Sequence, residues 1–166
     1  VIIKNWPSET FLYTIFYRLN TGSLSLSPQE LRRALKPGEF MDFVDEYSGS
    51  SKEIQKLLKL KVPDYRMRDM DLVIRYFAFA DRLKEYKGDY KSFLDSTCDF
   101  YNKSWAKNKS KIEDKAARLE ILIDTINKVF KPEHSFKRWR NNKYESRLNK
   151  AVFDIMIYYL QSEPVR

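Results

Sequence analysis

Residues 16–32, FYRLNTGSLSLSPQELR, read as the end of one helix, a short turn and the start of a second helix. The apolar side chains that lead into this stretch keep a helical spacing, which stops before Gly22. Gly22 is suited to the end of the first helix, because glycine adopts a left-handed backbone at little cost. Ser27 and Glu30 form a capping-box pair around Pro28, which is favoured at the first position of a helix. The stretch therefore predicts two helices joined by a turn, with the capping pair as structural residues.

Outward from this turn, apolar periodicity and helix-breaking residues predict further helices in both directions. The segment 69–86 is the most hydrophobic and is apolar around most of its circumference, which indicates a central, buried helix. Polar, basic loops are expected at 107–110 and 135–143. The expected helices cover residues 7–20, 28–36, 39–47, 51–60, 69–86, 90–105, 111–130 and 144–160.

The sequence predicts an all-α fold, an irregular bundle of about seven or eight helices with a short leftover strand at the N-terminus. Hydrophobic residues make up 43% of the chain, enough to build a core, and four glycines are few for a turn-rich β-sandwich. One helical domain is expected over residues 7–166, preceded by a strand at 1–6 that has no partner strand. Because the chain begins at Val1 and not at a methionine, we expect it to be the C-terminal part of a longer protein.

Composition argues against several classes of function. A single cysteine, Cys98, cannot form an internal disulfide and favours a reducing, cytoplasmic compartment. Together with the one histidine, His134, it supplies too few ligands for a structural zinc site. No metal site is therefore expected. There is no apolar run of about 18 residues and no signal-peptide pattern, so no membrane contact is expected. No catalytic motif is complete, and Cys98 lies on an apolar helical face, where a buried, inert thiol is expected.

The turn is the best candidate for a ligand site or an interdomain surface. Its amides and polar side chains can donate hydrogen bonds to a phosphate, helped by the positive end of the helix that begins at Pro28. Helix capping alone explains Gly22, whereas the other members have no local role and are expected to face a missing domain. The nucleotide-site or interdomain candidates are Arg18, Asn20, Thr21, Gly22 and Arg32.

Arg75 interrupts the apolar run of the central helix. A buried guanidinium without a counter-ion is costly. We therefore expect Arg75 either to point outward or to pair with a carboxylate, such as Asp71 or Glu30, as a structural clamp.

The net charge of +8 is concentrated in one part of the chain. Residues 103–150 hold 14 Lys and Arg against 6 Asp and Glu, whereas the rest of the chain holds 17 of each kind. Arginine beside aromatic side chains suits contact with phosphates and stacking on bases, and a solvated basic surface without a ligand is the alternative. The nucleic-acid-binding candidates are Lys107, Lys109, Lys111, Lys137, Arg138, Trp139, Arg140, Lys143 and Arg147.

The segment IFYRLNTGSLSLSPQELRRAL, residues 15–35, resembles the signature iFxRlNtgGxxLsxqElRnA of a large bacterial family, domain of unknown function 262. That family includes the GmrSD-type modification-dependent restriction enzymes and related phage-defence proteins. FKRWRNNKYESRLNKAVFDIMIYYL, residues 136–160, more loosely resembles the closing pattern of the family. Ser23 departs from the signature, which usually has a second glycine at that position.

The resemblance implies that this chain is the helical C-terminal part of the family's conserved domain. In the family, an N-terminal half with a ParB/sulfiredoxin-like fold carries an Asp-Gly-Gln-Gln-Arg motif linked to nucleotide hydrolysis, and these residues do not contain that motif. The whole protein would then be an NTP-using, DNA-directed defence or restriction factor, with NTP and a divalent metal bound outside this chain. The expected partners are the missing N-terminal half and DNA, and the chain itself is expected to lack a complete active site and a cofactor.

Two other functions fit the sequence. One is a helical module for protein–protein interaction that does not bind nucleic acid, with residues 1–6 completing a partner's sheet. The other is a helix-turn-helix regulator over residues 8–36. It is disfavoured because the turn at 21–27 exceeds the usual length of about three to four residues.

Overall fold

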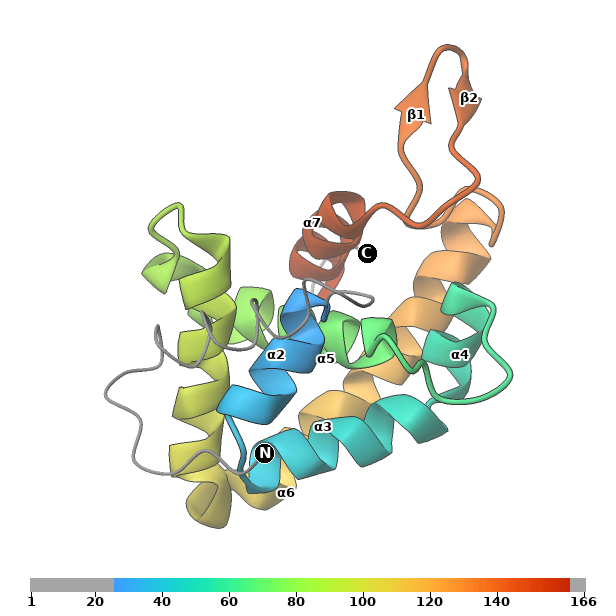
Figure 1. The fold of residues 1–166 in the computed structure, drawn as a ribbon. Coiled ribbons are helices and arrows are strands. Elements are labelled where there is room, and N and C mark those ends of the chain that lie inside the picture. The colour runs from blue at the N-terminus through green and yellow to red at the C-terminus, as the bar shows by residue number, and fades with distance from the viewer. Residues whose placement is uncertain (1–25, 162–166) are drawn as a thin grey trace.

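Helix α5 (Arg68–Arg82) occupies the centre of the computed structural model, which describes residues 26–161 (Figure 1). Every residue from 69 to 78 is buried, and α5 packs against helices that precede and follow it in the chain. The central, buried helix predicted for this segment is confirmed. The elements in chain order are α2 (Pro28–Leu35), α3 (Glu39–Ser50), α4 (Lys52–Leu58), α5, the 3-10 helix η1 (Leu83–Glu85), α6 (Tyr90–Phe130), β1 (Trp139–Arg140), β2 (Lys143–Tyr144) and α7 (Lys150–Gln161).

Aromatic side chains fill the core between α3, α5 and α6. Phe40 of α3 is fully buried, stacks on Tyr101 of α6 with the ring centroids 4.8 Å apart, and meets the edge of Phe77 of α5 at 5.3 Å. Helix α7 covers another part of α5, and its Phe153 packs against Phe136 at 5.3 Å. The core therefore draws on helices from the whole described length of the chain.

The all-α prediction is confirmed in outline, but the described residues contain six α-helices and not seven or eight. The main reason is α6, a single helix where the sequence predicts two helices and a loop at 107–110. That segment is polar but contains neither glycine nor proline, so it is compatible with a helix. Trp105 and Ile112 are both buried and continue one helical stripe across it. In Figure 1 α6 is bent, and its two ends lie on opposite sides of α5.

Two of the predicted elements lie outside the described residues. These are the helix at 7–20 and the strand at 1–6. The remaining predicted helices are present with shifted ends, the largest shift being at the start of α7.

A two-stranded antiparallel hairpin, β1–β2, replaces the expected start of the last helix. Trp139 pairs with Tyr144, and the two strands are joined by a two-residue turn, Asn141 and Asn142. Both asparagines have positive φ angles, 50° and 62°, as a type I′ turn requires. Asparagine tolerates this conformation better than most residues do, which explains why the chain turns here and does not continue as a helix.

The start of α3 is capped by a side chain from another helix. Gly38 occupies the N-cap position and has no side chain to offer. Asn102 of α6 takes this role: its Oδ1 accepts hydrogen bonds from the backbone N–H groups of Phe40 and Met41, at 3.1 and 3.4 Å. Its Nδ2 donates to two carbonyls of the preceding loop. A Cβ atom at Gly38 would lie 2.4 Å from this amide, so the glycine leaves the room that Asn102 needs.

We expect Asn102→Ala to lower the free energy of unfolding by about 1–2 kcal/mol, the usual cost of losing a helix cap. Asn102→Asp keeps the accepting oxygen, and its charge is favourable at the start of a helix, but its second oxygen faces the carbonyls of Lys36 and Pro37. It should therefore lose less stability than Asn102→Ala without reaching the wild type. Urea denaturation of the wild type and both variants measures the difference. Equal losses in the two variants would contradict the capping role of Oδ1.

Candidate functional site

The capping box that follows the predicted turn is present. The Glu30 N–H donates to Ser27 Oγ at 3.1 Å, and the Ser27 N–H donates to Glu30 Oε2 at 2.6 Å. Ser27 and Glu30 therefore have the structural role predicted for them. Four other candidates from the turn lie outside the described residues: Arg18, Asn20, Thr21 and Gly22.

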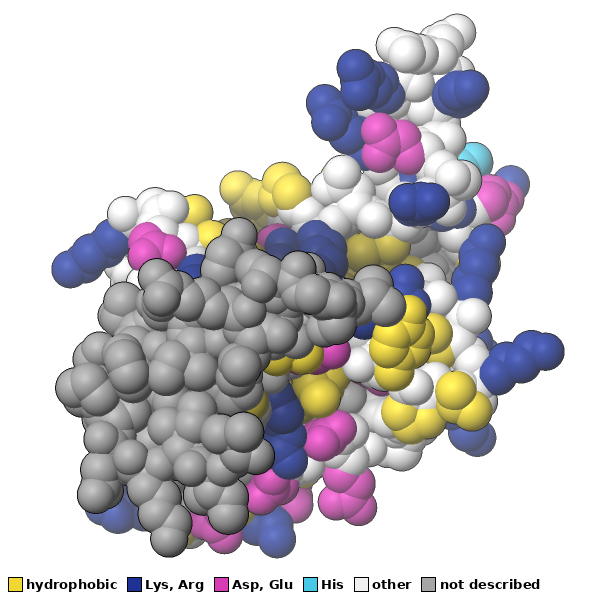
Figure 2. All heavy atoms as spheres, in the orientation of Figure 1, with side chains coloured by type: hydrophobic (Ala, Val, Ile, Leu, Met, Phe, Trp, Pro, Cys, Tyr) yellow, Lys and Arg dark blue, Asp and Glu magenta, His cyan; other side chains and the backbone are white. Residues whose placement is uncertain are grey.

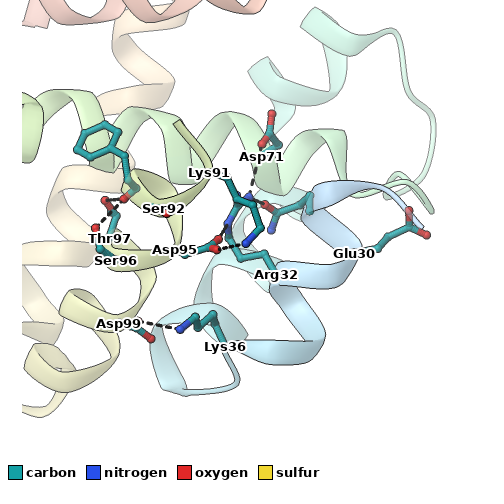
Figure 3. Close-up of polar contacts among 12 residues, drawn as sticks. Glu30, Arg32, Lys36, Asp71, Lys91, Ser92, Asp95, Ser96, Thr97 and Asp99 are labelled. Carbon is teal, nitrogen blue, oxygen red and sulfur yellow. Dashed lines mark hydrogen bonds and ion pairs between the residues drawn. The ribbon is translucent and has the colours of Figure 1, made fainter. Parts of the chain in front are cut away.

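Arg32, the remaining candidate from this region, lies inside the described part of the chain and is 3% exposed. Its Nε donates to Asp95 Oδ1 of α6 at 2.7 Å, and its Nη1 donates to Gln29 Oε1 at 2.6 Å (Figure 3). The same Nη1 lies 3.9 Å from Asp71 Oδ1 of α5. Arg32 thus ties α2 to α5 and α6, whereas the sequence led us to expect an exposed surface position.

Arg75 of α5 is buried and forms a bidentate ion pair with Asp154 of α7. Its Nε donates to Asp154 Oδ1 at 2.9 Å, and its Nη2 donates to Asp154 Oδ2 at 2.7 Å. Asp71, which the sequence offers as a partner, lies farther away at 3.7 Å. The guanidinium also lies 4.6 Å from the centre of the Tyr90 ring. Glu30, the other candidate partner, pairs with Arg66.

Two lysines extend these contacts into one connected network. Lys150 Nζ of α7 lies 2.7 Å from Asp71 Oδ2, and Lys91 Nζ of α6 lies 3.2 Å from Asp95 Oδ2. Charged side chains from α2, α5, α6 and α7 therefore meet in one region, part of which Figure 3 shows.

The sequence analysis named Asp71 as a possible partner of Arg75, but it missed two other acidic members of this network, Asp95 and Asp154. Asp154 carried a usable signal, because it interrupts the apolar run of α7 in the way that Arg75 interrupts the run of α5. Asp95 lies among other polar residues of α6 and carried no such signal.

A pocket of about 720 Å³ opens beside this network, and we call it the α2 pocket. Its wall includes Gln29 of α2, Tyr90 at the start of α6, and one carboxylate of the described residues, Asp71. Apolar side chains such as Met67 and Leu94 complete the wall. The cations that line it are Arg32, Arg66, Arg68, Arg75, Lys91 and Lys150.

Burial sets the protonation of several groups. It raises the pKa of Asp154 to about 6, although Arg75 acts in the opposite direction. Burial also raises the pKa of Tyr90, and it raises that of the buried Cys98 thiol to about 12. Cys98 therefore stays a protonated, unreactive thiol at neutral pH. Within residues 26–161 no group of three or more His, Cys, Asp or Glu side chains could hold a metal ion.

The second candidate site is the basic hairpin, residues 137–147, which projects from the helices (Figure 1). Of its predicted members, Lys137 is half-buried and donates to the carbonyl of Glu133 at 2.7 Å, while the others are exposed. Trp139 is 56% exposed, and its ring meets that of Tyr144 at 4.8 Å. The His134 ring stacks on the ring of Tyr144, with the ring centroids 4.2 Å apart. The exposed cations of the basic hairpin are Arg138, Arg140, Lys143 and Arg147.

None of these four cations has an ion pair among the described residues. Figure 2 shows Lys and Arg side chains gathered on the projecting hairpin, beside few acidic ones. By contrast, many cations elsewhere pair with a carboxylate, as Lys115 does with Asp81 and Lys128 with Asp124. The basic hairpin is therefore a surface on which positive charge is not neutralised locally.

The other predicted basic cluster lies elsewhere. Lys107, Lys109 and Lys111 are exposed in the middle of α6, and Lys109 pairs with Glu113 at 3.9 Å. About 30 Å of helix separates this segment from the end of α6, where the hairpin follows. The structure therefore does not bring the two basic clusters together.

No family model, no curated protein and no solved structure matches this chain. None of the helices described is both long and apolar enough to cross a membrane.

Proposed function

We propose that this chain is the helical part of a protein of the family called domain of unknown function 262, and that it supports NTP-dependent, DNA-directed defence or restriction. The resemblance of residues 15–35 and 136–160 to that family supports the proposal. In this proposal the whole protein is cytoplasmic. Its catalytic residues, NTP and divalent metal belong to the missing N-terminal half, which is the chain's first partner.

The chain's own contribution is contact with DNA through the basic hairpin. The observation that carries this step is a set of exposed cations that have no ion pair within residues 26–161 and that flank an exposed aromatic pair, Trp139 and Tyr144. Arginine and lysine bind DNA by neutralising phosphates and releasing condensed counter-ions. A two-stranded ribbon is also narrow enough to enter the major groove, and an exposed aromatic ring can stack on an unpaired base.

Salt dependence tests this proposal. If all four exposed cations contact phosphates, the affinity for a duplex of about 20 base pairs should fall about 100-fold between about 50 and 200 mM salt. Fluorescence anisotropy with a labelled duplex measures it. Replacing Arg138, Arg140, Lys143 and Arg147 together by alanine should remove most of the binding at low salt and most of the salt dependence.

The matched control removes the same charge elsewhere. Lys52, Lys61, Lys84 and Lys87 are exposed and lie outside the hairpin, so replacing them by alanine lowers the net charge equally. This variant should keep the affinity within about threefold of the wild type, because long-range charge effects are screened. Equal losses in both variants, or no DNA binding by the wild type at low salt, would overturn the role of the hairpin.

A protein-interaction module is the second candidate function. Ile155, Tyr158 and Tyr159 of α7 are exposed and place apolar surface on one helix. Such a surface suits a protein partner better than a polyanion. This function predicts that the chain does not bind DNA at any salt concentration, and that changing the hairpin leaves binding to its partner unchanged.

A further inference from the structure

We propose that the α2 pocket binds a phosphate-bearing ligand. This inference is independent of the basic hairpin, because it rests on groups at the junction of α2, α5, α6 and α7. The pocket has about 720 Å³, room for a phosphate together with a group the size of a sugar or small ring.

Two hydrogen-bond donors of residues that line the pocket lack partners among the described residues. Gln29 is 3% exposed, and its Oε1 accepts from Arg32, but its Nε2 has no hydrogen-bond partner. The hydroxyl of Tyr90 is also buried without a partner. A buried polar group without a partner destabilises a fold by about 1–3 kcal/mol. An amide N–H and a hydroxyl at the wall of a pocket are suited to donate to the oxygens of a ligand.

The charges around the pocket favour an anionic ligand. Six cations border it, whereas Asp71 is the one carboxylate among the described residues that does. Asp95 and Asp154, which pair with Arg32 and Arg75, do not border the pocket. Glu30 and Asp64, which pair with Arg66 and Arg68, do not border it either, whereas Lys150 pairs with Asp71 in the wall. The described part of the wall therefore holds more cations than carboxylates.

A second pocket extends this positive surface. It has about 630 Å³, and the described part of its wall holds no carboxylate. Arg68 and Lys150 border both pockets, so the two are adjacent. The second pocket also includes Arg147, a member of the basic hairpin. The wall of the second pocket contains the cations Lys59, Arg68, Arg147 and Lys150.

Phosphate fits this arrangement better than a carboxylate does. It presents several acceptor oxygens in different directions, and arginine binds it with two parallel hydrogen bonds. Donors here come from separate helices, Gln29 from α2 and Tyr90 from α6, so they can serve different oxygens of one phosphate group. The source of the phosphate is either a free phosphorylated small molecule or a nucleotide of DNA bound at the hairpin.

Inorganic phosphate is the first probe. Thermal denaturation of the chain should show a rise in Tm of about 3–5 °C once phosphate exceeds its Kd about tenfold, with chloride at equal ionic strength as the reference. Isothermal titration calorimetry then gives the Kd. A phosphate effect equal to that of chloride would overturn the proposal, since water alone would then satisfy the unpaired donors.

Two variants assign the binding to these donors. Gln29→Glu keeps the oxygen that accepts from Arg32 but replaces the donating amide by a negative oxygen, and it should weaken phosphate binding about tenfold or more. Tyr90→Phe removes a hydroxyl without a partner, so it should leave the unliganded protein at least as stable while weakening phosphate binding. Lys84→Ala, which lowers the net charge by the same amount outside the pocket, should bind as the wild type does. Unchanged phosphate binding in both pocket variants would overturn the proposal.

The two sources give different results with larger probes. A free phosphorylated ligand predicts that a 5′-mononucleotide binds more tightly than phosphate, and that a hairpin variant with alanine at Arg138, Arg140 and Lys143, which keeps the pocket residue Arg147, binds it normally. A nucleotide of bound DNA predicts that Gln29→Glu weakens binding of a single-stranded oligonucleotide, and that the hairpin variant weakens it as well. Because phosphate binding is measured without DNA, failure of the pocket and failure of the hairpin are distinguishable.

Discussion

Arg75→Ala is expected to lower the free energy of unfolding by about 3–5 kcal/mol, because it leaves the buried carboxylate of Asp154 without its counter-ion. For a domain of this size the change corresponds to a fall in Tm of about 10 °C. Asp71 depends less on Arg75, because its carboxylate lies 3.7 Å from the guanidinium. Lys150, at 2.7 Å, is the closer counter-ion of Asp71. Thermal and urea denaturation of the variant measure the loss.

A double-mutant cycle separates the ion pair from the rest of the site. Asp154→Leu alone should also be strongly destabilising, because it takes the bidentate partner from the buried guanidinium of Arg75, and Asp71 lies farther away at 3.7 Å. The single variant Arg75→Met completes the cycle, and the double variant Arg75→Met with Asp154→Leu replaces the pair by apolar side chains and should recover most of the stability. If the two single losses simply add in the double variant, the two residues do not act as a pair.

The pH dependence of the stability of Arg75→Ala identifies Asp154 as the group that this substitution leaves unpaired. The pKa of Asp154 is raised by burial to about 6 from an ordinary value of 3.8, so the folded protein holds this proton more tightly than the unfolded chain does. Its stabilising contribution is therefore fully present at low pH and is lost as the pH rises through about 6. Without Arg75 the pKa rises further. The difference in free energy of unfolding between the wild type and Arg75→Ala should consequently become smaller as the pH falls from about 7 to 5. A difference that does not change with pH would indicate that another group is responsible.

Structural features that depend on residues close together in the sequence were predicted correctly. The capping box depends only on Ser27 and Glu30 and the three-residue spacing between them, and both of its hydrogen bonds are present. The central helix was also predictable, because a segment that is apolar around most of its circumference can only be stable when it is surrounded. The burial of the Cys98 thiol was predicted because Cys98 lies on the apolar face of its helix.

Features that depend on distant residues were not predictable in this way. The partner of Arg75 lies 79 residues away, and a partner of Arg32 lies 63 residues away, so no spacing rule could select them. The polar segment at 107–110 shows a different limit. Polarity indicates exposure, and an exposed segment without glycine or proline can be a helix as readily as a loop. The turn of the hairpin, at Asn141 and Asn142, lies in the loop predicted at 135–143, but the pairing of its two strands was not predicted.

Phe40→Ala is expected to be as damaging as loss of the ion pair, about 3–5 kcal/mol, because it opens a cavity among three helices. The side chain is fully buried and contacts Tyr101 of α6 and Phe77 of α5 through their rings. These neighbours are themselves large and held by other packing, so they cannot move to fill the space. Urea denaturation, with the m-value as a check that the folded state is retained, measures the loss.

Phe43 is the matched control, because it lies on the same helix as Phe40 and carries the same side chain. The structure separates them: Phe43 is half-buried and packs at the edge of the core, with its ring 5.2 Å from that of Trp105 and 5.8 Å from that of Tyr47. Removing it leaves a groove that water can enter, so Phe43→Ala should cost about 1–2 kcal/mol, less than half the loss at Phe40. Equal losses would mean that α3 packs through both rings alike, in a different rotation about its axis. That rotation would also move Phe40 N–H away from Asn102, so the two stability experiments test the same placement of α3 by independent contacts.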